Sequence, residues 1–187
     1  MLIDVQLYEG KNLDTISQVE TLAAYGKDIV DDYAAYTAAT AILETAEKVT
    51  GTETATQQFI LLVGALRSIS NREHEVSLIL DSYLLRALAL AGWAPNFDSC
   101  TICSKPGPHR AFQLQLGGVV CEGCKPAGAV VLDPEAALLL GALLAGDWDF
   151  ADQSSTKARA AASGVVAAYT QWHMERGLKS LQHVERE

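Results

Sequence analysis

The sequence predicts a mainly α-helical protein with a small β part, in which a helical bundle carries an inserted four-cysteine module and follows a β-hairpin. Three observations predict this class. The first 24 residues alternate in polarity with the period of a strand, and five later segments repeat apolar residues with the period of a helix. The cysteines all fall within one short stretch, 100–124. Each observation assigns a different part of the chain.

Length and composition are those of a globular protein with a sizeable core. The chain has 187 residues, of which 49% are hydrophobic and 20% charged. We expect a cytoplasmic protein, because the start lacks the pattern of a signal peptide and no apolar run reaches the roughly 18 residues that span a bilayer. The net charge of −9 argues against binding nucleic acid over the whole surface.

A β-hairpin is predicted at the start. Ile3, Val5 and Leu7 alternate with polar residues, a turn follows at 9–12, and a second alternating run covers Thr15–Val19. Two strands alone bury too little surface to be stable in water. We therefore expect this hairpin to belong to a larger sheet.

Three helices are predicted next. The first runs from about Tyr25 to Gly51, the second over Thr54–Ser70 and the third over Glu75–Ala91, ending at Gly92 and Pro95. The apolar stripes expected to face the core are Ile29/Val30, Tyr33, Tyr36/Thr37, Leu43, Ala46 and Val49 on the first, Phe59, Leu62, Val63 and Leu66 on the second, and Val76, Ile79, Leu80, Tyr83, Leu84, Ala87, Leu88 and Ala91 on the third.

The cysteine module is predicted at about 96–128. An alternating strand over Phe112–Leu116, a turn at Gly117–Gly118 and a return strand at Val119–Val120 lie between two cysteine pairs. Beyond the module, Asp133 and Pro134 begin a helix that ends at Gly146.

A loop over Asp147–Ser155 and a last helix over Thr156–Leu178 complete the predicted elements. The last helix is expected to bury one stripe through Val165, Tyr169, Trp172 and Arg176.

The cysteines form two CxxC pairs, Cys100 with Cys103 and Cys121 with Cys124, at the spacing of a four-thiolate zinc site. Four thiolates leave no open coordination position, so this zinc would be structural. Iron in a rubredoxin-like site, disulfides and free thiols are the alternatives. His109 could replace one cysteine, although a solvated histidine is the plainer interpretation of that residue.

Cations beside the cysteines suggest a binding surface. Residues 100–132 hold three basic groups, Lys105, Arg110 and Lys125, against the single acid Glu122. Such groups can contact phosphates or acidic partners, and the alternative is an ordinary solvated loop. No nucleophile elbow, metalloprotease motif or phosphate-binding loop is present. The pattern therefore indicates binding rather than catalysis.

The ordered set of motifs resembles one known family. Gly10-Lys11-Asn12-Leu13-Asp14, the tyrosine-rich first helix, Gly92-Trp93-Ala94-Pro95 before the first cysteine pair, Phe112…Gly117-Gly118-Val119-Val120 before the second, and Gln171-Trp172-His173 recur in this order. They resemble the bacterial recombination and repair mediator family RecO, in its zinc-binding actinobacterial form. The resemblance covers essentially the whole chain.

The resemblance implies an organisation and a function. Residues 1–24 would be a remnant of an N-terminal OB-fold sheet, and 25–187 the helical domain with its zinc ribbon. The family anneals complementary strands and helps load recombinase on DNA coated by single-stranded-DNA-binding protein; without most of the OB domain these activities would be impaired. The implied partners are RecR, single- and double-stranded DNA and the acidic C-terminal tail of that binding protein. The implied location is the cytoplasm, in association with the nucleoid.

Three more cations are candidates for the acidic-tail site that the resemblance implies: Arg86 on the third helix, and Arg176 and Lys179 on the last. Two other functional classes remain open from the residues alone. One is an iron-bearing electron-transfer module, and the other is a purely structural interaction domain without a nucleic-acid role.

Overall fold

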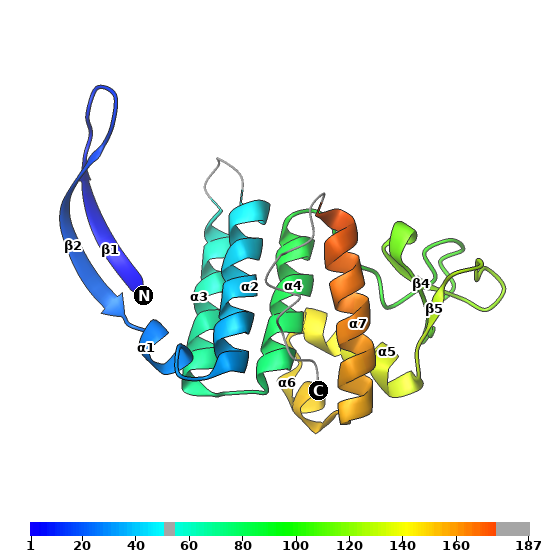
Figure 1. Cartoon of the computed structure of the whole chain (residues 1–187). Coiled ribbons are helices and arrows are strands. Elements are labelled where there is room, and N and C mark those ends of the chain that lie inside the picture. Colours follow the sequence, from blue (N-terminus) through cyan, green and yellow to red (C-terminus); the bar gives the residue numbers. More distant parts are fainter. Residues whose placement is uncertain (51–54, 175–187) are drawn as a thin grey trace.

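The computed structural model describes residues 1–50 and 55–174. Four long helices stand side by side: α2 (Tyr33–Val49), α3 (Thr56–Asn71), α4 (Val76–Leu90) and α7 (Thr156–His173) (Figure 1). The hairpin lies at one end of this row and the cysteine module at the other. The predicted class, a helical bundle with a hairpin and a small β module, is confirmed.

Helix α4 is the centre of the bundle. It packs against α2, α3, α5 and α7, and ten of its fifteen residues are buried. The predicted stripe is buried from Ile79 to Leu88, but Leu78, Asp81, Ser82 and Leu85 are buried as well. A one-sided stripe was therefore too narrow a prediction, because a helix surrounded by neighbours buries nearly its whole circumference.

The first predicted helix is two helices, and its predicted core face is wrong in part, since Ile29 and Thr37 are buried but both tyrosines are not. A four-residue α1 (Gly26–Ile29) ends before Asp32, whose Oδ1 accepts the Ala35 N–H at 3.1 Å and caps α2. Tyr33 and Tyr36 are 59% and 52% exposed, whereas Ala38, Ala41 and Ile42 are almost fully buried. The small alanines face α4 because they let the two helices approach closely.

Helix α3 shows the same displacement of its buried face. Phe59 is 54% exposed, and Leu62, Val63 and Leu66 are only half-buried. The fully buried positions are Ala65 and Ile69, together with two polar residues, Gln58 and Ser68. The helical period was predicted correctly here. Leu62 and Leu66 pack at the edge of the core, but the fully buried face is displaced from the predicted one.

The hairpin consists of β1 (Leu2–Tyr8) and β2 (Thr15–Ala23), paired antiparallel as predicted. It forms a two-stranded sheet of its own. Its apolar side chains are between 37% and 59% exposed at Ile3, Val5, Leu7, Ile16, Val19 and Leu22. No other strand of the described residues pairs with it, so its apolar faces remain open to solvent.

The cysteine module holds a three-stranded sheet in the order β4–β3–β5, from β3 (Ala111–Gln113), β4 (Gly118–Val120) and β5 (Val130–Val131). The predicted strand over 112–116 is too long. Leu114–Leu116 form a 3₁₀ turn, η1, which ends at Gly117 with φ 63° and contacts α7. Strand β5 was not predicted from the sequence.

The helices after the module begin and end largely as predicted. The Oδ1 of Asp133 accepts the Ala136 N–H at 2.9 Å to cap α5 (Pro134–Ala145), and Gly146 ends it with φ 78°. The predicted loop over 147–155 is wrong, because it contains α6 (Trp148–Gln153), capped by Asp147. The predicted end of α7 at Leu178 and its stripe residue Arg176 lie outside the described residues. Of the described residues of that stripe, Val165 and Tyr169 are buried as predicted, whereas Trp172 is 55% exposed.

Two hydrophobic clusters hold the molecule together. The large one fills the bundle, and a small one consists of Cys100, Ala111, Val120 and Cys121. Phe112 joins the module to the bundle: its ring lies 5.7 Å from that of Phe97 and, edge-on, 5.7 Å from that of Tyr169 on α7. No described helix is long and apolar enough to cross a membrane.

Candidate metal centre and ligand groove

The four cysteines converge on one point. Their Sγ atoms all lie within 4.8 Å of one another, and the sulfurs of Cys103 and Cys121 are 3.7 Å apart. A tetrahedral zinc site with Zn–S bonds of about 2.3 Å has sulfur–sulfur edges of about 3.8 Å. The observed spacing fits such a site, and all four thiols are free rather than joined in disulfides.

Backbone hydrogen bonds shape the two cysteine turns. The Cys100 N–H donates to the Lys105 carbonyl at 2.9 Å, and the Ser104 N–H donates to the Cys100 carbonyl at 2.8 Å. In the second turn the Cys124 N–H donates to the Cys121 carbonyl at 3.0 Å. These bonds fold each CxxC sequence so that both of its sulfurs turn to one side.

Gly118 joins the first cysteine turn to the sheet. A Cβ at this position would lie 2.6 Å from both the Asn96 carbonyl oxygen and the Thr101 side chain. The close approach allows the Val119 N–H to donate to Asn96 O and the Thr101 N–H to donate to Val119 O, both at 2.9 Å. Only glycine permits this packing, which holds Cys100 against the strand that leads to Cys121.

The thiols influence one another's ionisation. The backbone N–H of Cys121 stabilises the thiolate of Cys100 and lowers the pKa of that thiol to about 6. The sulfurs of Cys121 and Cys103 raise the pKa of Cys124 to about 12. Four thiolates at this distance repel one another, so a divalent cation bound between them would be needed for all four to ionise.

The predicted cations of the module are on its surface. Lys105, Arg110 and Lys125 are all exposed. Lys125 forms an ion pair with Glu122 at 2.6 Å, and this pairing lowers the pKa of Glu122. His109 does not join the four sulfurs, because its Nε2 lies 2.9 Å from the Lys105 carbonyl oxygen.

A groove of about 680 Å³ runs between α3 and α4, on the bundle rather than the module. We call it the α3–α4 groove. Its first wall is α3, its floor is α4, and the end of α5 and the start of α6 supply the second wall. Its lining includes Gly64, Arg67 and Ser68 on α3, Tyr83 and Arg86 on α4, Glu73 and His74 in the connecting loop, Leu144 at the end of α5, and Trp148 on α6.

The α3–α4 groove combines an apolar surface with two arginines. Arg67 is exposed on the α3 wall, and Arg86 rises half-buried from the α4 floor. Gly64 leaves open space on the α3 wall, since a Cβ there would contact nothing within 4 Å. Such a site can hold a peptide that carries both apolar side chains and carboxylates.

Of the three cations predicted for an acidic-tail site, the structure places only Arg86 at this groove. Arg176 and Lys179 lie outside the described residues. The sequence did not reveal Arg67, His74 or Trp148 as members of one site. The capping pattern of Asp147 followed by Phe150 was the one local signal that could have revealed α6 and therefore Trp148.

Comparison with known proteins gives consistent matches. The family model described as "Recombination protein O C terminal" matches residues 30–182. A "DNA repair protein RecO" from Thermobifida fusca is 53% identical over 98% of this chain and 76% of its own length. Proteins of the same name from Streptomyces avermitilis and Streptomyces coelicolor are 49% and 50% identical, over 98% of this chain and 77% of their own lengths.

Proposed function

This chain belongs to the RecO family, and from that membership we propose that it is a non-enzymatic mediator of DNA repair and homologous recombination. It would assist strand annealing and the loading of recombinase on DNA coated by single-stranded-DNA-binding protein. The observation that supports this best is the family match over 30–182, together with relatives about half identical over nearly the whole chain. A mediator brings partners together and needs no catalytic group of its own.

In this proposal one structural zinc ion is held by Cys100, Cys103, Cys121 and Cys124. The mutual spacing of their sulfurs supports it. Thiolate ligands suit zinc, and a closed four-sulfur site stabilises the fold without activating water. The metal would hold the two cysteine turns together and so keep the module's surface in shape.

The module's surface would contribute to DNA contact through Lys105, Arg110 and Lys125. Their exposure supports this, although Lys125 already neutralises Glu122. Phosphate contacts of this kind supply affinity without reading sequence. Single- and double-stranded DNA are the expected ligands.

The α3–α4 groove would receive the acidic C-terminal tail of single-stranded-DNA-binding protein. Arg67 and Arg86 can pair with carboxylates, and the apolar floor between them can take hydrophobic side chains. Two guanidinium groups on an otherwise acidic protein favour an acidic ligand at this place. RecO's partner RecR is assigned in this proposal to the N-terminal side of the protein.

Residues 1–24 would correspond to the last strands of an OB-fold sheet, and 25–187 to the helical domain with its zinc ribbon at about 96–128. The exposed apolar faces of β1 and β2 support this, because strands inside a larger sheet bury such faces. RecR and part of the DNA contact would involve that sheet.

Annealing of complementary strands coated with single-stranded-DNA-binding protein tests the proposal. We expect the chain to accelerate annealing, measured by energy transfer between labelled strands, and a protein without mediator function leaves the rate unchanged. In parallel, labelled single-stranded DNA is titrated at several salt concentrations. The variant Lys105→Gln/Arg110→Gln/Lys125→Gln should bind more weakly and reduce the slope of log affinity against log salt by about 2.

The matched control for this titration is Lys27→Gln, which removes an exposed cation on α1, away from the module. Its salt slope should equal that of the wild type. An unchanged slope in the triple variant would remove the module's cations from the DNA contact. Binding that is insensitive to salt would favour a purely structural interaction domain.

A further inference from the structure

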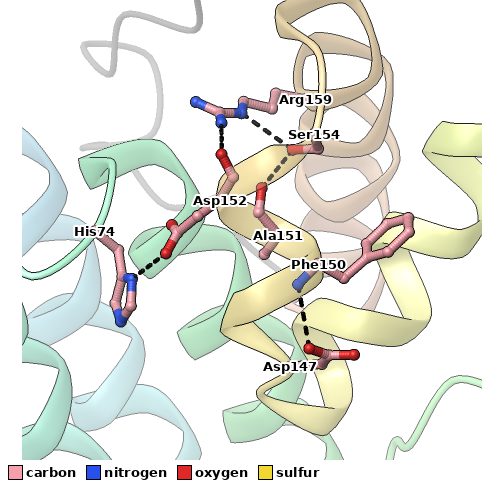
Figure 2. Close-up of polar contacts among 7 residues, drawn as sticks. All are labelled: His74, Asp147, Phe150, Ala151, Asp152, Ser154 and Arg159. Atoms are coloured by element: carbon pink, nitrogen blue, oxygen red, sulfur yellow. Dashed lines mark hydrogen bonds and ion pairs between the residues drawn. The ribbon is translucent and has the colours of Figure 1, made fainter.

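The side chain of His74, in the loop between α3 and α4, contacts helix α6 at two points. His74 Nδ1 lies 2.7 Å from Asp152 Oδ2, and the imidazole ring stacks on the Trp148 indole with centroids 4.0 Å apart and planes 7° from parallel (Figure 2 for the polar contact). Trp148 and Asp152 are four residues apart and therefore lie on the same face of α6. One imidazole thus holds both.

The C-terminal end of α6 is held by Arg159 on α7. Arg159 Nη2 donates to the Asp152 carbonyl at 2.8 Å, and its Nε donates to Ser154 Oγ at 3.1 Å (Figure 2). Asp152 therefore connects the bundle helix α7 to the α3–α4 loop, through its backbone on one side and its carboxylate on the other. The carboxylate side of this connection reaches the groove through His74, which lines it.

Helix α6 depends on such contacts for its position. It has six residues, of which only Ala151 is buried. A helix this short has little stability of its own, so its place is set by tertiary contacts. Trp148 is half-buried and lines the α3–α4 groove beside His74, so the position of α6 sets the shape of the groove's second wall.

His74 also bears on the charge of the groove. It lies next to Glu73, faces Asp152 from α6, and borders Asp28, Asp32, Arg72 and Glu75 on its outer side. Asp152 is not one of the residues that line the groove, but its carboxylate contacts His74, which is. His74 donates a hydrogen bond to that carboxylate, and its stack on Trp148 holds the indole in the wall of the groove.

We propose that His74 is a positioning residue for the α3–α4 groove: through its contact with Asp152 and its stack on Trp148, it holds the second wall in the shape that receives an acidic peptide. The inference rests on the proposed function of the groove. It goes further by assigning peptide affinity to a side chain that acts through Trp148. A preformed wall spares the peptide the entropic cost of ordering α6 on binding.

The test uses two readouts on the full chain. The probe is a fluorescently labelled peptide of the acidic C-terminal tail of single-stranded-DNA-binding protein, titrated by anisotropy. The second readout is acrylamide quenching of Trp148 in a Trp93→Phe/Trp172→Phe background, where it is the only one of the three tryptophans left. His74→Ala should weaken peptide binding about tenfold and make Trp148 more accessible to acrylamide.

A conservative replacement separates positioning from general destabilisation. His74→Phe keeps an aromatic ring on Trp148 and should restore most of the shielding and part of the affinity. Asp152→Ala should weaken peptide binding in the wild-type background and add little in the His74→Ala background, because the two residues act through one contact. Glu75→Gln, the neighbouring change on the same loop, should alter neither readout. Loss of affinity in His74→Ala without rescue or change in Trp148 quenching overturns the inference.

Arg86→Gln distinguishes failure of this inference from failure of the proposed site. If Arg86→Gln loses peptide binding while His74→Ala binds as the wild type does, the groove is the peptide site and His74 does not position it. If the wild type does not bind the peptide, the proposed occupant of the groove and the role of His74 both fall.

Discussion

Ser82 and Tyr83 are neighbours on the buried helix α4 and differ in how their hydroxyls are satisfied. Ser82 Oγ donates to the Leu143 carbonyl at 2.7 Å and so ties α4 to α5. The Tyr83 hydroxyl is buried and has no hydrogen-bond partner among the described residues. Burial also raises the pKa of Tyr83, so the hydroxyl stays neutral. A buried hydroxyl without a partner costs about 1–3 kcal/mol.

Opposite effects on stability are therefore expected at these two positions. Tyr83→Phe should raise the free energy of unfolding by up to about 1 kcal/mol, because it removes the unpaired hydroxyl and keeps the ring. Ser82→Ala should lower it by about 1 kcal/mol, because the Leu143 carbonyl loses its donor. Urea unfolding of both variants checks the pair. A large loss of stability in Tyr83→Phe would mean that the hydroxyl is satisfied in solution.

At the scale of elements, Glu135 joins the first turn of α5 to the start of α7. Its two carboxylate oxygens accept from the Ser155 N–H and the Ser155 hydroxyl, each at 2.7 Å. Ser155 Oγ in turn accepts the Ala158 N–H at 3.2 Å and caps α7. The hydroxyl and N–H of Ser155 lower the pKa of Glu135 from its usual 4.5. One carboxylate thus links two helix N-termini.

The lowered pKa predicts how stability varies with pH. A carboxyl whose pKa is lower in the folded state contributes stability above its unfolded pKa, and this contribution is lost as the pH falls through its folded pKa. Glu135→Gln should therefore be less stable than the wild type at neutral pH, and the difference should shrink in acid. Urea unfolding across this pH range measures it, with Glu47→Gln on α2 as the control. A difference that does not vary with pH would contradict the linkage.

For the whole molecule, the two hydrophobic clusters predict separate responses to metal removal. The small cluster contains two of the four cysteines, whereas the bundle core contains none. We expect chelation to unfold the sheet of the module and leave the helical signal in circular dichroism largely intact. Loss of the helices together with the metal would show that the module and the bundle form one folding unit.

Elemental analysis of two variants tests which metal is bound and whether Cys121 is one of its ligands. Cys121→Ser should lower the zinc content per chain, since three ligands hold the ion less tightly. Glu122→Gln, the adjacent change, should leave it unaltered because it disturbs only the pair with Lys125. Elemental analysis gives the stoichiometry, and strong visible absorbance would indicate iron in place of zinc.

Local patterns were predicted well and orientations were not. The caps at Asp133 and Gly146, the hairpin and the convergence of the cysteines followed from the sequence, because each depends on residues close together in the chain. The core face of α2 did not. Tyrosine is as apolar in a periodicity count as alanine, and only the tight approach to α4 decides that Ala38 goes inside while Tyr36 stays out.

The sequence by itself determined the helical periods, the grouping of the four cysteines and the family, because short-range geometry and the order of motifs carry that information. The tertiary structure alone decided where the α3–α4 groove lies and what lines it. Arg86, His74 and Trp148 come from three separate segments, and no local pattern relates them. They meet because α3 and α5 pack on α4, which is buried around most of its circumference, and α6 packs on α5, so the candidate peptide site exists only in the packed molecule.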